Sequence, residues 1–201
     1  MGVTWTLIVA VALIWALALV YVRIRRWWLV FYLGGAFGLI LLVVAIANVS
    51  MIDTWLASVE AQQTAVLAGI VGIGVTAAGY GTGLAIPNQS GWAVFNIGIE
   101  CSALIEMAAI VGLSIFYPAF SPLRKVTTAV VGLSVTYVAN LLRILLIVAV
   151  INTMGTSWVF AAHAVIGRVF FFGATITLFW FIMTRPTVSI ANLRLKEAVD
   201  E

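Results

Sequence analysis

The sequence predicts an all-α polytopic membrane protein with about five transmembrane helices and an N-terminus on the outer side. Hydrophobic residues make up 64% of the 201 residues and charged residues only 8%, whereas a typical soluble domain carries roughly 25% charged residues. One cysteine and one histidine exclude an internal disulfide and a metal site built from a cluster of such residues. We expect a single integral-membrane domain over residues 1–201, with no metal and no other cofactor.

Five apolar segments are predicted to cross the membrane. The first of them carries no charge and is long enough for the roughly 30 Å hydrocarbon core. The third is shorter, but Pro118 marks a clear end. Residues 184–201 follow the last span and are expected to form a cytoplasmic tail. In chain order the predicted spans are residues 3–22, 29–49, 101–117, 126–151 and 161–183.

The basic residues predict the sidedness of the chain, because cytoplasmic loops of membrane proteins are enriched in Lys and Arg. Basic clusters follow the first span and precede the fourth, and no Lys or Arg occurs from Trp27 to Leu123. Both clusters can be cytoplasmic only if an even number of crossings separates them, and the second and third spans supply two. Residues 51–99 should therefore stay on the outer side. Because the basic residues follow membrane topology, we expect no nucleic-acid partner.

An outer interfacial helix is predicted from Asp53 to about Val75. Large apolar residues recur there at helical spacing, and polar residues, Glu60 among them, fall between them. The apolar run inside this segment is short and rich in glycine, which argues against a further span. We expect the helix to lie in the outer leaflet with Glu60 on its polar face.

A small β-hairpin is predicted to follow this helix. Residues 80–86 and 92–99 alternate in period two on either side of the turn-rich residues 87–91. The alternative is an irregular loop, because the segment is rich in glycine. Either form would deliver the chain directly to Cys101.

Several polar residues fall in the predicted outer half of the last three spans. A charged residue inside a span costs at least a few kcal/mol, so each is a functional hypothesis. One explanation is structural: Glu106 forms an ion pair with Arg143 or Arg168 and holds the helices together. The residues concerned are Cys101, Glu106, Asn140, Arg143, His163, Gly167 and Arg168.

The other explanation is catalytic, with Cys101, Arg143 and His163 converging on a cleft open to the outer face. A thiol at the first turn of a helix is favoured as the reactive thiolate by the helix dipole. The only histidine can carry its proton near neutral pH. A fixed guanidinium in a water-poor site can stabilise the oxyanion of an acyl-transfer intermediate. From these residues alone, both explanations stay open.

Three further residues have a supporting role in either explanation. Asn140 shares a helix face with Arg143, so its amide could orient the guanidinium or join two helices. Gly167 lies one turn after His163 and would admit a substrate backbone or a neighbouring helix. Glu100 could tune the adjacent thiol or sit at the membrane interface.

Three motifs, in this order and each in the outer part of a predicted span, resemble the exosortase/archaeosortase family. The short chain is most similar to the compact members from Gram-positive bacteria, and the resemblance covers roughly residues 69–172. The motifs are Glu100-Cys101-Ser102-Ala103, Asn140-Leu141-Leu142-Arg143 and His163-Ala164-Val165-Ile166-Gly167.

This resemblance implies a polytopic cysteine transpeptidase that cleaves C-terminal sorting tails of exported proteins. Such a tail consists of a short motif, a transmembrane helix and a basic cluster, and the acceptor would be a lipid or another cell-envelope molecule. By the resemblance, Cys101 is the nucleophile, Arg143 the second catalytic residue, and His163 occupies the third position. Family members commonly continue Cys-Ser-Gly where this chain has Ala103, which leaves the substrate detail open.

The expected location is the cell membrane, with the site facing the extracytoplasmic side. The main alternative function is a non-enzymatic transporter or channel, in which Glu106, Arg143 and Arg168 line a path for a solute or protons. Such a path needs polar residues through its full depth. The inner halves of the last three spans are almost wholly apolar, which argues against transport.

Overall fold

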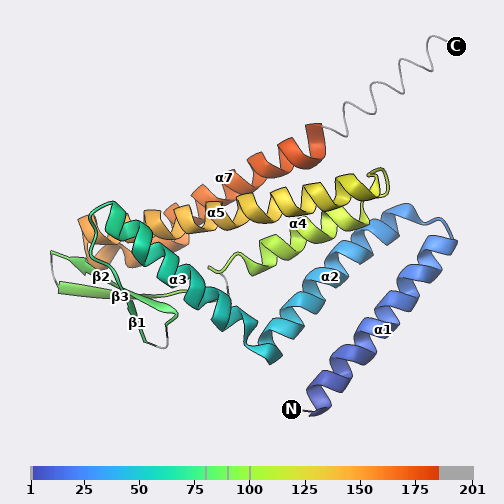
Figure 1. Cartoon of the computed structure of the whole chain (residues 1–201), viewed down its shortest axis with the longest axis horizontal. Coiled ribbons are helices and arrows are strands. Elements are labelled where there is room, and N and C mark those ends of the chain that lie inside the picture. The colour runs from blue at the N-terminus through green and yellow to red at the C-terminus, as the bar shows by residue number, and fades with distance from the viewer. Residues whose placement is uncertain (1, 80, 90, 100, 186–201) are drawn as a thin grey trace, which may run out of the picture.

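The chain is described by a computed structural model that is mostly helical with one small antiparallel sheet, as predicted (Figure 1). The residues described are 2–79, 81–89, 91–99 and 101–185. In chain order the elements are α1 (Gly2–Ile24), α2 (Trp28–Ser50), α3 (Ile52–Ile70), β1 (Thr76–Ala78), β2 (Gly83–Asn88), β3 (Gly91–Asn96), α4 (Leu104–Phe116), α5 (Pro122–Met154), the 3₁₀ turn η1 (Thr156–Trp158), α6 (Val159–Ala161), the π-helical η2 (Ala162–Gly167), α7 (Arg168–Phe179) and the π-helical η3 (Trp180–Thr184).

Four helical stretches are long and apolar enough to cross a membrane: Thr4–Ile24, Trp28–Ser50, Pro122–Met154 and Thr156–Thr184. They correspond to four of the five predicted spans. The remaining predicted span, residues 101–117, corresponds to α4. This helix is apolar but has only 13 residues, which is about 20 Å at 1.5 Å per residue. The chain is therefore a multi-pass membrane protein in which α4 is shorter than each of the four helical stretches that are long enough to cross.

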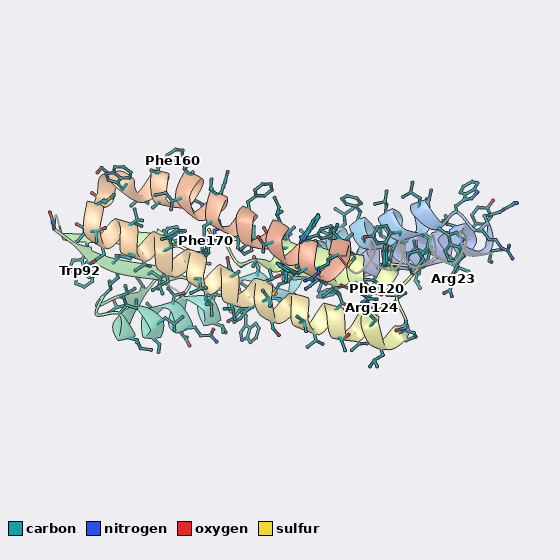
Figure 2. The ribbon with its side chains drawn as sticks, turned by 90° about the horizontal axis from the view of Figure 1, so that it is seen from above. Arg23, Trp92, Phe120, Arg124, Phe160 and Phe170 are labelled. Atoms are coloured by element: carbon teal, nitrogen blue, oxygen red, sulfur yellow. The ribbon has the colours of Figure 1, made fainter. Side chains whose placement is uncertain are left out.

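The two basic loops lie at the same end of the molecule. Figure 1 shows the α1–α2 and α4–α5 connections at one end and the sheet with α3 at the other. Figure 2 places Arg23 and Arg124 at the first end, the basic end, and Trp92 at the opposite end, the sheet end. This is the arrangement that the charge pattern requires. That the basic end faces the cytoplasm stays a prediction from the sequence.

Helix α3 differs from the predicted interfacial helix in the face that it buries. Its buried residues are small, except for Glu60, while the large side chains of Trp55 and Val66 are exposed. The prediction that Glu60 lies on an exposed polar face is therefore wrong. At a membrane surface, lipid solvates large apolar side chains, and small residues let helices approach closely. The buried residues of α3 are Ala57, Glu60, Ala61, Thr64 and Ala68.

The predicted hairpin is present as β2 and β3, with a third strand, β1, that the sequence did not indicate. The antiparallel register pairs Gly83 with Asn96 and Asn88 with Gly91, so the strands run closer to the turn than predicted. The sheet is fixed to the end of α5, because Asn152 Nδ2 donates to the Pro87 carbonyl oxygen at 2.7 Å. Below it, one apolar core joins the sheet to α3 and α5; it includes Leu84, Ile86, Ile147, Val148 and Ile151.

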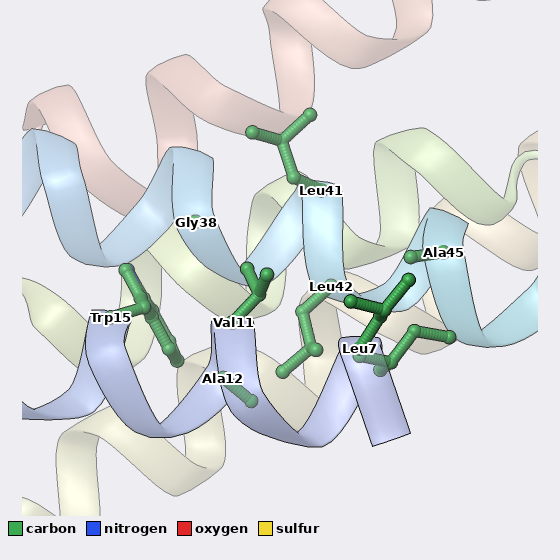
Figure 3. A pocket seen from close by; sticks show the side chains of 9 residues that line it. Leu7, Val11, Ala12, Trp15, Gly38, Leu41, Leu42 and Ala45 are labelled. Atoms are coloured by element: carbon green, nitrogen blue, oxygen red, sulfur yellow. The ribbon is translucent and has the colours of Figure 1, made fainter. Parts of the chain in front are cut away.

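An apolar cavity of about 350 Å³ lies between α1 and α2 (Figure 3). The two helices are joined beside it by a hydrogen bond from Trp15 Nε1 to the Gly34 carbonyl oxygen at 2.9 Å. A Cβ at Gly38 would overlap the Trp15 indole, so the close approach requires glycine there. The cavity has no titratable side chain and is not a candidate for catalysis. Its lining is Leu7, Ile8, Val11, Ala12, Trp15, Gly38, Leu41, Leu42 and Ala45.

Ala103 is the turn residue immediately before α4, and its backbone conformation is strained. It is fully buried and has φ 51° and ψ 9°, a left-handed conformation that costs a residue with a Cβ roughly 1–2 kcal/mol. We expect Ala103→Gly to change stability by less than about 1 kcal/mol, since relief of strain offsets the greater freedom of the unfolded chain. Ala103→Val should destabilise by roughly 2 kcal/mol or more.

The stability of both Ala103 variants can be measured by thermal unfolding of the purified full chain in detergent. A valine variant as stable as the original protein would contradict the left-handed conformation.

Candidate active site

Cys101 lies in the tight connection between β3 and α4, not in the first turn of a helix as predicted. The helix begins only at Leu104, because Ala103 takes the left-handed conformation just before it. The connection is closed by the Cys101 backbone N–H, which donates to the Gly98 carbonyl oxygen at 2.8 Å. The Ser102 hydroxyl donates to the Ile99 carbonyl oxygen at 3.2 Å. The thiol is buried, and Glu100 lies outside the described residues.

His163 is the first partner of this thiol. Cys101 Sγ lies 3.4 Å from Nδ1 and 3.8 Å from Nε2 of His163. The histidine belongs to the π-helical η2, and an inserted π turn is a common feature of functional sites in helices. The Phe95 ring of β3 lies 5.5 Å from the imidazole, centroid to centroid. The sheet thus supports the imidazole.

Arg143 is the second partner and comes from α5. Its Nη2 lies 3.9 Å from Cys101 Sγ, and its side chain is buried. The guanidinium lies over the Phe171 ring of α7 at 5.2 Å from the centroid, a cation–π contact that restrains its orientation. Three segments far apart in the chain therefore meet at one sulfur atom, with a basic ring on one side and a fixed positive charge on another.

Asn140 connects the cysteine turn to α3. Its Nδ2 donates to the Cys101 carbonyl oxygen at 2.7 Å and to Glu60 Oε1 at 3.0 Å. Burial raises the pKa of Glu60 to about 8, although the Asn140 hydrogen bond and the charge of Arg143 act in the opposite direction. Glu60 was missed as a site residue in the sequence. The available signal was its position among the small residues of one helix face, which is typical of a packing surface.

A cavity of about 410 Å³ borders Arg143 on the side of α4 and α7. Glu106 and Arg168 also line it, so the structure brings these two residues to the same space as Arg143. The remaining lining is mostly apolar: Ile105, Phe171, Phe172 and Thr175. Arg143 is the residue that connects this space to the thiol, because its guanidinium lines the cavity and also lies 3.9 Å from Cys101 Sγ.

Gly167 occupies a packing position. A Cβ there would lie 2.8 Å from Ile147 Cδ1 of α5, so the glycine permits the approach of α5 to η2. The same two elements carry Arg143 and His163, so a side chain at this position would disturb the packing beside the site. Among the described residues, no group of three His, Cys, Asp or Glu side chains could hold a metal ion.

The model of the transmembrane exosortase family matches residues 2–180 of the chain. The protein belongs to the transmembrane exosortase family. The match includes the first two helices, beyond the residues 69–172 that carried the resemblance of motifs. No curated protein and no solved structure matches the chain significantly. Exosortases are a family of cysteine transpeptidases, and the matched range contains Cys101, Arg143 and His163.

Proposed function

We propose that the chain is a membrane-embedded cysteine transpeptidase that cleaves C-terminal sorting tails of exported proteins at the outer membrane face. The proposal is supported by one observation: atoms of His163 and Arg143 both lie within 3.9 Å of the buried Cys101 sulfur. A nucleophile, a proton carrier and a fixed cation are the three groups that acyl transfer needs.

In the first step, the Cys101 thiol passes its proton to His163, and the thiolate attacks the carbonyl carbon of the scissile peptide bond. A C–S bond forms and the carbonyl oxygen becomes an oxyanion, which the Arg143 guanidinium stabilises. The His163 imidazolium then gives its proton to the leaving nitrogen as the C–N bond breaks. The tail leaves as an amine, and the exported protein remains on Cys101 as a thioester.

In the second step, an amine or hydroxyl group of a lipid or another cell-envelope acceptor attacks the thioester carbonyl. His163 accepts the proton of the attacking group, and the C–S bond breaks to return the Cys101 thiolate. The product is the exported protein joined to the acceptor by an amide or ester bond. If water attacks instead, the same sequence ends in hydrolysis.

The substrate tail would reach the site through the cavity between α4 and α7. Arg143 forms part of its wall, and the exposed side chains of Ile105 and Phe172 stand at its edge. An apolar tail helix in the bilayer can pack against such side chains without leaving lipid. The scissile bond would then lie at the membrane depth of Cys101.

Geometry deeper in the bundle disfavours the transport alternative. A second cavity between α4 and α7 has a volume of only about 10 Å³ and is lined by apolar residues apart from Ser114. Such a space is at the lower limit for a single water molecule. A solute or proton path along these helices would be interrupted there.

Trapping of the thioester tests the proposal. The substrate is a tailed reporter, by which we mean an exported protein fused to a sorting motif, an apolar helix and a basic cluster from the same organism. Mass spectrometry of the acid-quenched reaction should find the reporter fragment attached at Cys101, and hydroxylamine should release it. A reporter without the tail is the control. Because Cys101 is the only thiol, alkylation with iodoacetamide should block processing, and processing by fully alkylated protein would overturn the proposal.

A further inference from the structure

The interface between α3 and α5 holds a buried carboxyl group that the proposed chemistry does not use. Glu60 is 0% exposed, and its Oε1 accepts a hydrogen bond from Asn140 Nδ2 at 3.0 Å. The same amide nitrogen donates its other hydrogen to the Cys101 carbonyl oxygen at 2.7 Å. Glu60 is therefore one hydrogen-bonded residue away from the backbone of the proposed nucleophile.

The other oxygens of this pair are left without donors. Among the described residues, Glu60 Oε2 and Asn140 Oδ1 are both buried and have no hydrogen-bond partner. A carboxylate and an amide oxygen only accept, so an ionised Glu60 leaves two buried acceptors without a donor, which is unfavourable. One proton on Oε2 supplies a donor within the pair. A neutral carboxyl and an amide can then form two parallel hydrogen bonds.

We infer that Glu60 is a positioning residue of the proposed transpeptidase, and that its neutral carboxyl group locks Asn140 and thereby the Cys101 backbone in the reactive arrangement. This inference rests on the function proposed above. It assigns α3 a part in the site in addition to packing. It also explains why an acidic residue lies on a helix face that otherwise consists of small residues.

The charges around Glu60 determine what its ionisation would do. Arg143 and Tyr137 face it from α5 and Glu106 from α4, while β1 and β2 carry no titratable residue. Helix α2 has only Tyr32, near the opposite end. A negative Glu60 would attract the Arg143 guanidinium, which the thiolate and the oxyanion need. The neutral form leaves that charge for the reaction.

The consequence is a loss of activity in alkaline solution. Burial places the pKa of Glu60 near 8, so the neutral form predominates below this pH and disappears above it. Raising the pH from about 7 to about 9 lowers the neutral fraction about tenfold for such a group. Glu60→Gln keeps a donor and an acceptor in the same places but cannot ionise. Glu60→Leu keeps neither.

The test compares kcat/KM for the tailed reporter in the full-length protein and its variants between about pH 7 and pH 9. We expect Glu60→Leu to lose about tenfold or more at pH 7, and Glu60→Gln to rescue most of that loss. The ratio of the Glu60→Gln rate to the unsubstituted rate should rise about tenfold towards pH 9. Asp53→Asn removes a carboxylate from the same helix away from this pair and should follow the unsubstituted pH profile.

Infrared spectroscopy provides a readout that does not depend on turnover. At about pH 7 the spectrum of the unsubstituted protein should contain a protonated-carboxyl band that Glu60→Gln removes. Absence of that band, or superimposable pH profiles of the two proteins, would overturn the inference. If neither the unsubstituted protein nor any variant processes the reporter, the proposed function is refuted. The protonated-carboxyl band then still shows whether Glu60 is neutral.

Discussion

Cys101→Ala is expected to abolish processing of the tailed reporter while leaving the protein folded. The sulfur is the atom that both His163 and Arg143 approach, and no other thiol exists in the chain. Loss of the nucleophile of a covalent mechanism removes the pathway, so the rate should fall by at least about 10⁴-fold. Immunoblotting of the reporter measures the ratio of cleaved to uncleaved protein.

Stability of the Cys101 variants must be measured alongside. Removing one buried sulfur should cost only about 1–2 kcal/mol, so Cys101→Ala should retain its thermal unfolding transition in detergent. Cys101→Ser is a matched variant of nearly the same shape whose hydroxyl is a far weaker nucleophile near neutral pH. Both variants should be inactive. Normal processing by a folded alanine variant would exclude Cys101 as the nucleophile.

Arg143→Lys is expected to lower kcat for the tailed reporter by about 10²–10³-fold, the usual effect of removing an oxyanion donor. The positive charge is kept, but an ammonium group does not reproduce the planar fork of donors. The lysine would also lose the contact between the planar guanidinium and the Phe171 ring. Because the contribution is made in the transition state, KM should change much less than kcat.

Arg124→Lys provides a matched control for this substitution. Arg124 also lies over an aromatic ring, with its guanidinium carbon 4.5 Å from the Phe120 centroid, but it lies at the basic end of the molecule (Figure 2). The Arg124→Lys variant should process the reporter at the rate of the unsubstituted protein. If both lysine variants lose activity equally, the effect belongs to membrane insertion or stability and the role of Arg143 in the oxyanion step is refuted.

Much of the fold was predictable because membrane-spanning segments can be recognised from the local sequence. A run of apolar residues long enough for the bilayer needs no partner to be identified, which is why four of the predicted spans agree with the helical stretches. The β-hairpin was predictable from alternation. The boundary at Cys101 was not, because the start of α4 depends on the backbone conformation of Ala103.

The face of α3 that is buried could not be predicted from the sequence pattern either. In water, large apolar side chains point inward, and this expectation placed Glu60 outside. In a membrane the lipid is as apolar as the protein interior, so helix contacts favour small residues instead. The buried face of α3 follows the second rule, and the sequence alone does not say which solvent a short interfacial helix meets.

The sequence by itself determined the class of protein and the order of the three motifs, and it predicted that the unusual polar residues lie in the outer half of the membrane. Only the tertiary structure decided that Cys101, Arg143 and His163 meet, that Asn140 joins the cysteine turn to Glu60, and that Gly167 packs against Ile147. The reason is physical. Hydropathy and charge act residue by residue along the chain, whereas these contacts depend on how helices rotate about their axes when they pack.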